Sequence, residues 1–166
     1  MFHRQYLYNY DTNEQLIRYL NENSVDQPQI NSWISHLLNA HFIWLSRLKG
    51  EESPYAVWQV HNHLQRPKIN QQAWTATRQF LNNTDNLSQT IIYQNSKGTS
   101  FQNRIDDILW HVLNHSTHHR GQISTVIRQQ GLAPEPMDYI FYTREEIEEG
   151  SPETRVRKPD PGQVPG

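Results

Sequence analysis

The sequence predicts an all-α protein that folds as a four-helix bundle. Four segments of the chain repeat their apolar residues at the spacing of an α-helix. Two of these segments end just before a glycine, Gly50 and Gly131, a residue that often terminates helices. The chain has 166 residues, close to one typical domain, and four helices of this length in one domain indicate a bundle.

The first two helices are predicted over residues 6–21 and 29–49. The first has its apolar and aromatic residues mainly at helical spacing: Leu7, Tyr10, Leu16, Ile17 and Leu20. The second has a broader stripe: Ile30, Trp33, Ile34, Leu37, His41, Trp44, Leu45 and Leu48. Each stripe is expected to face the core.

The other two helices are predicted over residues 70–84 and 101–130, and the last has the clearest repeat. Residues 53–67 contain two prolines and several polar residues, and they are expected to form a long crossover between the second and third helices. Before the fourth helix, residues 90–93 and 98–100 flank a turn-like segment, which indicates a small hairpin.

A single domain over residues 1–149 is the simplest division of the chain. Residues 150–166 contain four prolines and almost no residue to bury, so they are expected to form a flexible tail. Just before that tail, the short aromatic run at residues 137–142 is expected to dock on the bundle.

Composition excludes several classes of function. The chain has 15 Lys and Arg against 17 Asp and Glu, a formal net charge of -2, which argues against general nucleic-acid binding. It contains no cysteine, which excludes a disulfide scaffold, a zinc ribbon and a cysteine nucleophile. No apolar stretch is long enough to span a membrane and the first residues lack a signal-peptide pattern, so a cytoplasmic location is expected.

Four histidines lie within nine residues of the predicted fourth helix. A helix advances by about 100° per residue, which places His119 within the core-facing stripe, His115 at its edge, and His111 and His118 on the other side. Two imidazoles at positions i and i+4 can bind one cation. The alternative is a pair of hydrogen-bonded core histidines. The segment lacks the glutamate of an HExxH metalloprotease, because Ser116 stands there.

A metal site would need at least one more ligand, and the second helix offers His36 and His41. Helical phase slightly favours His41, which lies in the middle of the apolar stripe. A helix in a bundle contacts two neighbours, however, so the flank with His36 can also face the interior. Both histidines have structural alternatives, in aromatic packing or in a polar seam. In the crossover, His61 and His63 are expected to be exposed to solvent.

The motifs around these histidines resemble the DinB family of metalloproteins. The string from His115 to Ile123, HSTHHRGQI, is similar to the HxxHHRGQ signature of that family. The string from His36 to Leu48, with Trp44 eight residues after its histidine, resembles the family's second motif. Residues 8–10 with Asn13, and residues 131–139, also resemble the family in this order. The resemblance covers about residues 1–145.

The resemblance implies a four-helix bundle that holds one divalent metal ion, usually nickel or zinc. By position, the implied ligands are His36, His115 and His119, with His41 as the runner-up for the place of His36. His41 would otherwise line the pocket. The resemblance also implies that Arg120 and Gln122 tie neighbouring helices or loops together and do not bind the metal.

The resemblance also implies candidate activities. Relatives include S-transferases that use bacillithiol, mycothiol or glutathione, which implies a metal that activates a low-molecular-weight thiol for attack on an electrophile. Hydrolysis by metal-bound hydroxide is a second enzymatic interpretation. No carboxylate has the spacing that would mark a general base, although Asp106, Asp107 and Asp138 are candidates. A third interpretation is a non-enzymatic, metal-stabilised bundle that acts as a stress-related binding protein. A homodimer is expected, since relatives often pair through their helices.

Overall fold

The computed structural model describes residues 2–95 and 97–145 of the chain. The protein is mostly helical, as predicted, with one two-stranded sheet. Its elements in chain order are α1 (Phe2–Glu22), α2 (Pro28–Lys49), α3 (Gln65–Asn82), β1 (Thr90–Gln94), β2 (Ser100–Arg104), α4 (Ile105–Gln129) and α5 (Tyr139–Thr143). No helix in these ranges is long and apolar enough to cross a membrane. The predicted tail at 150–166 lies outside the described residues, and the domain boundary at 149 stays a prediction.

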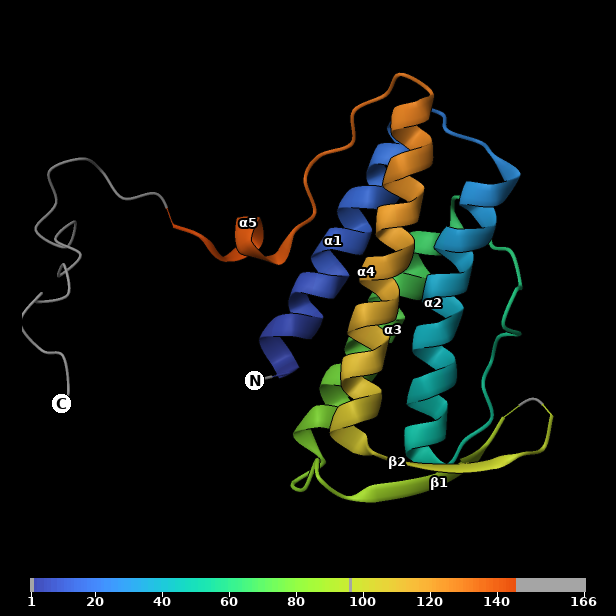
Figure 1. Ribbon diagram of the computed structural model, residues 1–166, viewed down its shortest axis with the longest axis vertical. Coiled ribbons are helices and arrows are strands. Elements are labelled where there is room, and N and C mark those ends of the chain that lie inside the picture. The colour runs from blue at the N-terminus through green and yellow to red at the C-terminus, as the bar shows by residue number, and fades with distance from the viewer. Residues whose placement is uncertain (1, 96, 146–166) are drawn as a thin grey trace, which may run out of the picture.

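The four long helices lie side by side, and the hairpin of β1 and β2 lies across one end of them (Figure 1). Helix α2 packs against α3 and α4, and α1 packs against the same two helices from the other side. The connection between α2 and α3, residues 50–64, runs back along α2 (Figure 1). This path places the crossover beside the middle of α2.

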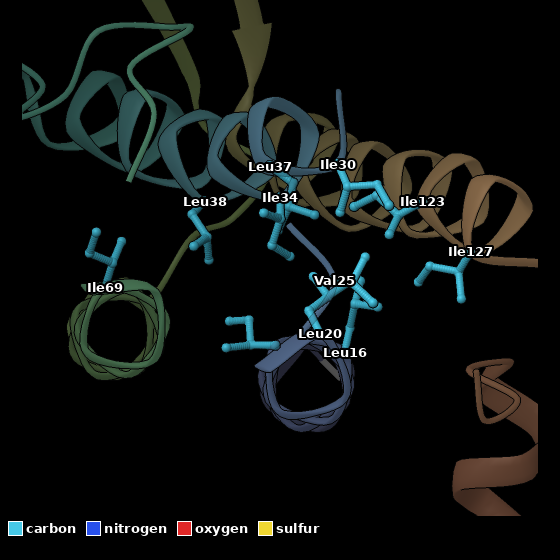
Figure 2. Close-up of a cluster of buried hydrophobic side chains, with 11 residues drawn as sticks. Leu16, Leu20, Val25, Ile30, Ile34, Leu37, Leu38, Ile69, Ile123 and Ile127 are labelled. Atoms are coloured by element: carbon cyan, nitrogen blue, oxygen red, sulfur yellow. The ribbon is translucent and has the colours of Figure 1, made fainter. Parts of the chain in front are cut away.

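Buried aliphatic side chains from all four long helices meet in one cluster, shown in Figure 2. Its labelled members are Leu16, Leu20, Val25, Ile30, Ile34, Leu37, Leu38, Ile69, Ile123 and Ile127. Burying a side chain of this size stabilises a fold by about 1.5–3 kcal/mol. A second cluster joins α1, α3 and α4 and includes Leu109 and Val112. The α4 members of the two clusters lie before and after His115 and His119, so apolar packing on both sides fixes that part of α4.

Two helix boundaries differ from the prediction for identifiable reasons. Helix α4 begins at Ile105 and not at Phe101, because residues 100–104 pair with β1 as the second strand of the expected hairpin. Helix α3 begins at Gln65 and includes Pro67, which the prediction had assigned to the crossover. A proline in the first turn of a helix removes no hydrogen bond that the helix would otherwise form.

A buried arginine connects α4 to α1. The guanidinium of Arg120 donates hydrogen bonds to Oδ1 of Asn9 (2.6 Å), Oδ1 of Asn13 (2.9 Å) and Oγ1 of Thr117 (3.0 Å). Asn13 in turn donates to Asn70 of α3 (3.2 Å). These bonds confirm the expectation that Arg120 ties neighbouring helices together.

The aromatic run after α4 docks on α1, as predicted. The hydroxyl of Tyr8 donates to the carbonyl of Met137 (2.6 Å), and that of Tyr142 donates to Asp11 (2.6 Å). The ring of Tyr8 also makes an edge contact with that of Tyr139, at 5.0 Å between centroids. These contacts explain why the last described segment lies beside α1 in Figure 1.

Candidate metal centre

Three histidines from two helices meet between α2 and α4. His36 comes from α2, and His115 and His119 come from α4. One ring nitrogen of each lies within 4.8 Å of the others. The closest pair is Nε2 of His36 and Nε2 of His115, which are 3.1 Å apart. The structure therefore brings together the three residues that the resemblance implied as ligands.

The positions of these histidines follow from the faces of their helices. On α4, His119 is buried and His115 half-buried, whereas His111 and His118 are exposed, in agreement with the helical phase. On α2, His36 is buried because this helix packs against α4 on one side and α3 on another. The flank that carries His36 faces α4.

The crossover holds the ring of His36 in place. Nδ1 of His36 hydrogen-bonds to the carbonyl of Val57 (2.9 Å). A carbonyl only accepts, so Nδ1 carries the proton and Nε2 has a free lone pair. The amide of Asn39, almost one turn further along α2, donates to the carbonyls of Gln59 (2.7 Å) and Val57 (3.4 Å). Asn39 thus fixes the segment to which His36 is bonded.

His61 extends this hydrogen-bond network, which sequence reasoning missed. It was expected to be exposed, but it is 2% exposed, and its Nε2 bonds to Oδ1 of Asn39 (2.6 Å). Its backbone N–H donates to Oγ of Ser35 (3.0 Å). The exposure prediction was wrong because two polar residues of α2 face the crossover. His63 is exposed, as expected.

Burial keeps His115 and His119 of α4 uncharged at neutral pH. Burial, followed by the nearby imidazoles of His119 and His36, lowers the pKa of His115 to about 3. Burial and then His36 also lower the pKa of His119, whereas hydrogen bonding with Gln122 raises it. An uncharged imidazole offers a lone pair, which is the form that binds a metal.

His119 and Gln122, one helical turn apart on α4, each have a buried polar atom. Nδ1 of His119 and Oε1 of Gln122 are both enclosed, and neither makes a well-formed hydrogen bond with the described residues. A proton on Nδ1 would leave Nε2 of His119 free to accept a metal.

His41 lies apart from this cluster. Its Nε2 hydrogen-bonds to Oγ1 of Thr77 on α3 (2.7 Å), and its ring packs against Tyr6 of α1 at 5.4 Å between centroids. Helical phase was right that His41 is buried, but it favoured the wrong histidine for the cluster. At His41, the stripe of α2 meets Thr77 of α3 and Tyr6 of α1.

His41 is expected to make stability depend on pH. Burial lowers its pKa from 6.5 to about 4, so between these values the unfolded chain binds a proton that the folded chain does not. Stability is therefore full above pH 6.5 and falls as pH decreases toward 4, by up to about 3 kcal/mol for this group. Chemical denaturation of metal-free protein across this pH range should show that the free energy of unfolding falls less in His41→Gln than in the unmodified protein. An equal fall in both proteins would contradict the role of His41 in this pH dependence.

The carboxylates named from the sequence lie outside the cluster of three histidines. Asp106 pairs with Arg104 (2.5 Å), Asp107 is exposed, and Asp138 precedes α5. Among the residues that the structure describes, the group of metal-ligand atoms at this place contains histidine nitrogens only. The site therefore consists of imidazole nitrogens without an acidic ligand.

Comparison with known proteins agrees with the sequence motifs. The family model described as DinB family matches residues 9–154, most of the chain. A segment of 63 residues is 36% identical to Protein DinB of Bacillus subtilis (strain 168) and covers 38% of this chain and 37% of that protein. The match thus spans little more than a third of the relative's length. Because the family model matches well over half of the sequence, the chain belongs to the DinB family.

Proposed function

We propose that the protein binds one divalent metal ion, nickel or zinc, through His36, His115 and His119. The convergence of three ring nitrogens within 4.8 Å supports this proposal most directly. The 3.1 Å between the Nε2 atoms of His36 and His115 is close to the roughly 3.3 Å between two nitrogens bound to a tetrahedral zinc ion. The donor set fits the metal that the family implies.

The proposed activity is metal-dependent activation of a low-molecular-weight thiol, as in an S-transferase. When bound, a divalent ion held by three neutral ligands would favour the deprotonated, nucleophilic form of a coordinated thiol or water. Hydrolysis by activated water is the second enzymatic candidate. The chain's own residues orient the ligands and shape the access to them, and within the described residues no carboxylate joins the site as a general base.

Trp58 of the crossover forms one wall of the proposed site. Its ring stacks on that of His36 at 3.9 Å between centroids with an interplanar angle of 12°, and the residue is 58% exposed. His115 is half-buried. The centre therefore has one side near solvent, where a small substrate could enter, which favours an enzyme over a fully enclosed structural metal site.

A direct test compares metal-loaded protein with protein stripped by a chelator. Purified protein is incubated with a thiol such as glutathione and a generic electrophile, and thiol consumption is followed with time. The proposal expects consumption that depends on metal and is lost in His115→Ala. Metal binding with no thiol consumption and no hydrolysis would favour the alternative, a metal-stabilised binding protein without enzymatic activity.

Asn39 is expected to support metal binding without contacting the metal. Asn39→Ala removes the bonds to the carbonyls of Val57 and Gln59 and to His61. Loss of such orienting contacts typically weakens metal affinity about 10–100-fold. Competition with a chelator of known affinity measures this loss. Asn114→Ala, at an exposed position of α4, is the matched control. Unchanged affinity in Asn39→Ala would contradict the orienting role.

We further propose that α1–α4 form the four-helix bundle implied by the family and that the protein is a homodimer in the cytoplasm. Light scattering at micromolar concentration should give about twice the mass of one chain. A monomer mass would refute the dimer.

A further inference from the structure

A pocket adjoins the candidate metal centre on the side of the hairpin. Its volume is about 290 Å³. It is lined by Trp44 of α2, Tyr93 and Asn103 of the hairpin, and Asp107, Ile108 and His111 of α4. The ring of His111 lies 5.4 Å from that of His115 and 5.0 Å from that of Trp44, between centroids. His111 therefore lies between the pocket and His115.

Arg47 is not among the residues that line this pocket, but its guanidinium contacts two of the rings that do. The guanidinium carbon of Arg47 is 4.5 Å from the centroid of the Trp44 ring and 5.1 Å from that of Tyr93. Tyr93 and Trp44 also contact each other edge to face, at 5.2 Å between centroids. These contacts hold the long side chain of Arg47 in one place and reduce the entropy that it would lose on binding a ligand.

The charge of Arg47 is not neutralised by an ion pair. Within residues 2–95 and 97–145, ion pairs join Lys49 to Glu51 and Arg104 to Asp106, and none involves Arg47. Asp107, the acidic residue of the pocket, is exposed and makes no pair with Arg47. A guanidinium has five N–H donors in a planar fork, and stacking on rings leaves these donors available.

We propose that Arg47, beside this pocket, binds the carboxylate group of a small organic substrate whose apolar part occupies the pocket and whose reacting atom lies at the cluster of three histidines. Arg47 would pair with the carboxylate and the amide of Asn103 could donate a further hydrogen bond, while Trp44 and Tyr93 cover the apolar part of the molecule. This inference rests on the proposed function, because it treats the histidine cluster as the reacting centre. It assigns the hairpin a role in substrate binding.

The first experiment does not depend on metal. Metal-free, full-length protein is titrated with succinate and followed by NMR at the Trp44 indole N–H and the backbone amides of Tyr93 and Asn103. We expect saturable shifts there that Arg47→Gln weakens about tenfold or more, since a hydrogen bond to a charged group is lost. Arg78→Gln is the matched control, because Arg78 stacks on Trp74 of α3, at 6.0 Å from the ring centroid. It should bind succinate like the unmodified protein.

The second experiment uses metal-loaded protein and compares two thiols, mercaptosuccinate and the uncharged 1-thioglycerol. Calorimetry should show about tenfold or tighter binding of mercaptosuccinate, and Arg47→Gln should remove most of this preference while Arg78→Gln keeps it. If the protein binds no metal, the proposed function fails and the succinate titration still decides the inference.

A second uncharged variant, Arg47→Met, keeps the test valid if Arg47→Gln does not fold. Arg47→Met keeps an unbranched side chain against the two rings and removes the charge, so it should behave like Arg47→Gln. Circular dichroism shows which variant is folded. The inference is overturned if succinate causes no shifts at the pocket, if a folded uncharged variant of Arg47 binds succinate normally, or if Arg78→Gln loses as much affinity.

Discussion

Replacement of His36, His115 or His119 by alanine is expected to abolish metal retention. Each change removes one of three imidazole nitrogens that converge within 4.8 Å. A divalent ion would then keep two protein ligands, and the affinity should fall by more than the roughly 10–100-fold that follows loss of an orienting contact alone. Elemental analysis after extended dialysis, on proteins reconstituted with nickel or zinc, measures the metal per chain.

His41→Ala is the matched control for these three variants. Its imidazole is as buried as that of His36 and comes from the same helix, but it bonds to Thr77 and packs against Tyr6. It should therefore retain metal and lose only stability. Metal loss in His41→Ala with retention in His36→Ala would overturn the proposed ligand set, whatever the outcome for His115 and His119.

The pair of histidines on α4 could be found from the sequence because the information is local. His115 and His119 are one turn apart, and the apolar residues around them define the buried face of a long helix. The same local pattern predicted that α2 is buried along most of its length. A repeat of apolar residues is sufficient to predict which face of a helix is buried, because the repeat depends on the sequence of that helix alone.

The choice between His36 and His41 could not be made from the periodicity of α2. Both residues are buried, since α2 packs against α4 on one flank and against α3 on another. Helical phase reports that a side chain faces the interior, but it does not report which neighbour it meets. The motif resemblance supplied the missing information, because it relates His36 to the α4 histidines as one set.

The contacts of the crossover were beyond sequence reasoning for a related reason. Asn39 bonds to carbonyls about 20 residues further along the chain, and His61 is buried only because the connection returns along α2. The hairpin was predicted, but residues 101–104 were assigned to the fourth helix, because their pairing with β1 decides their conformation and their own short pattern does not. Each of these features depends on partners distant in sequence.

Arg120 is expected to be the side chain whose loss destabilises the fold most among the polar residues. It is 2% exposed, and burial lowers the pKa of its guanidinium without depriving it of its charge. The cost of burying that charge is offset by hydrogen bonds to Asn9, Asn13 and Thr117, which are neutral. The guanidinium also lies over the ring of Tyr8, at 5.4 Å from the centroid.

Arg120→Met should lower the free energy of unfolding by about 3 kcal/mol or more, because it leaves the buried amide oxygens of Asn9 and Asn13 without a strong donor. For a chain of this size, that loss corresponds to a decrease in melting temperature of roughly 6–12 °C. The free energy of unfolding of Arg120→Lys should lie between those of the unmodified protein and Arg120→Met. Its ammonium group keeps the charge but cannot reproduce the planar fork that reaches several acceptors. Arg128→Met is the matched control, at an exposed position two turns further along α4, and it should change stability by less than about 0.5 kcal/mol.

Thermal unfolding of metal-free protein makes this comparison independent of the metal centre. A melting temperature for Arg120→Met equal to that of Arg128→Met would show that the polar network between α1 and α4 contributes nothing to stability.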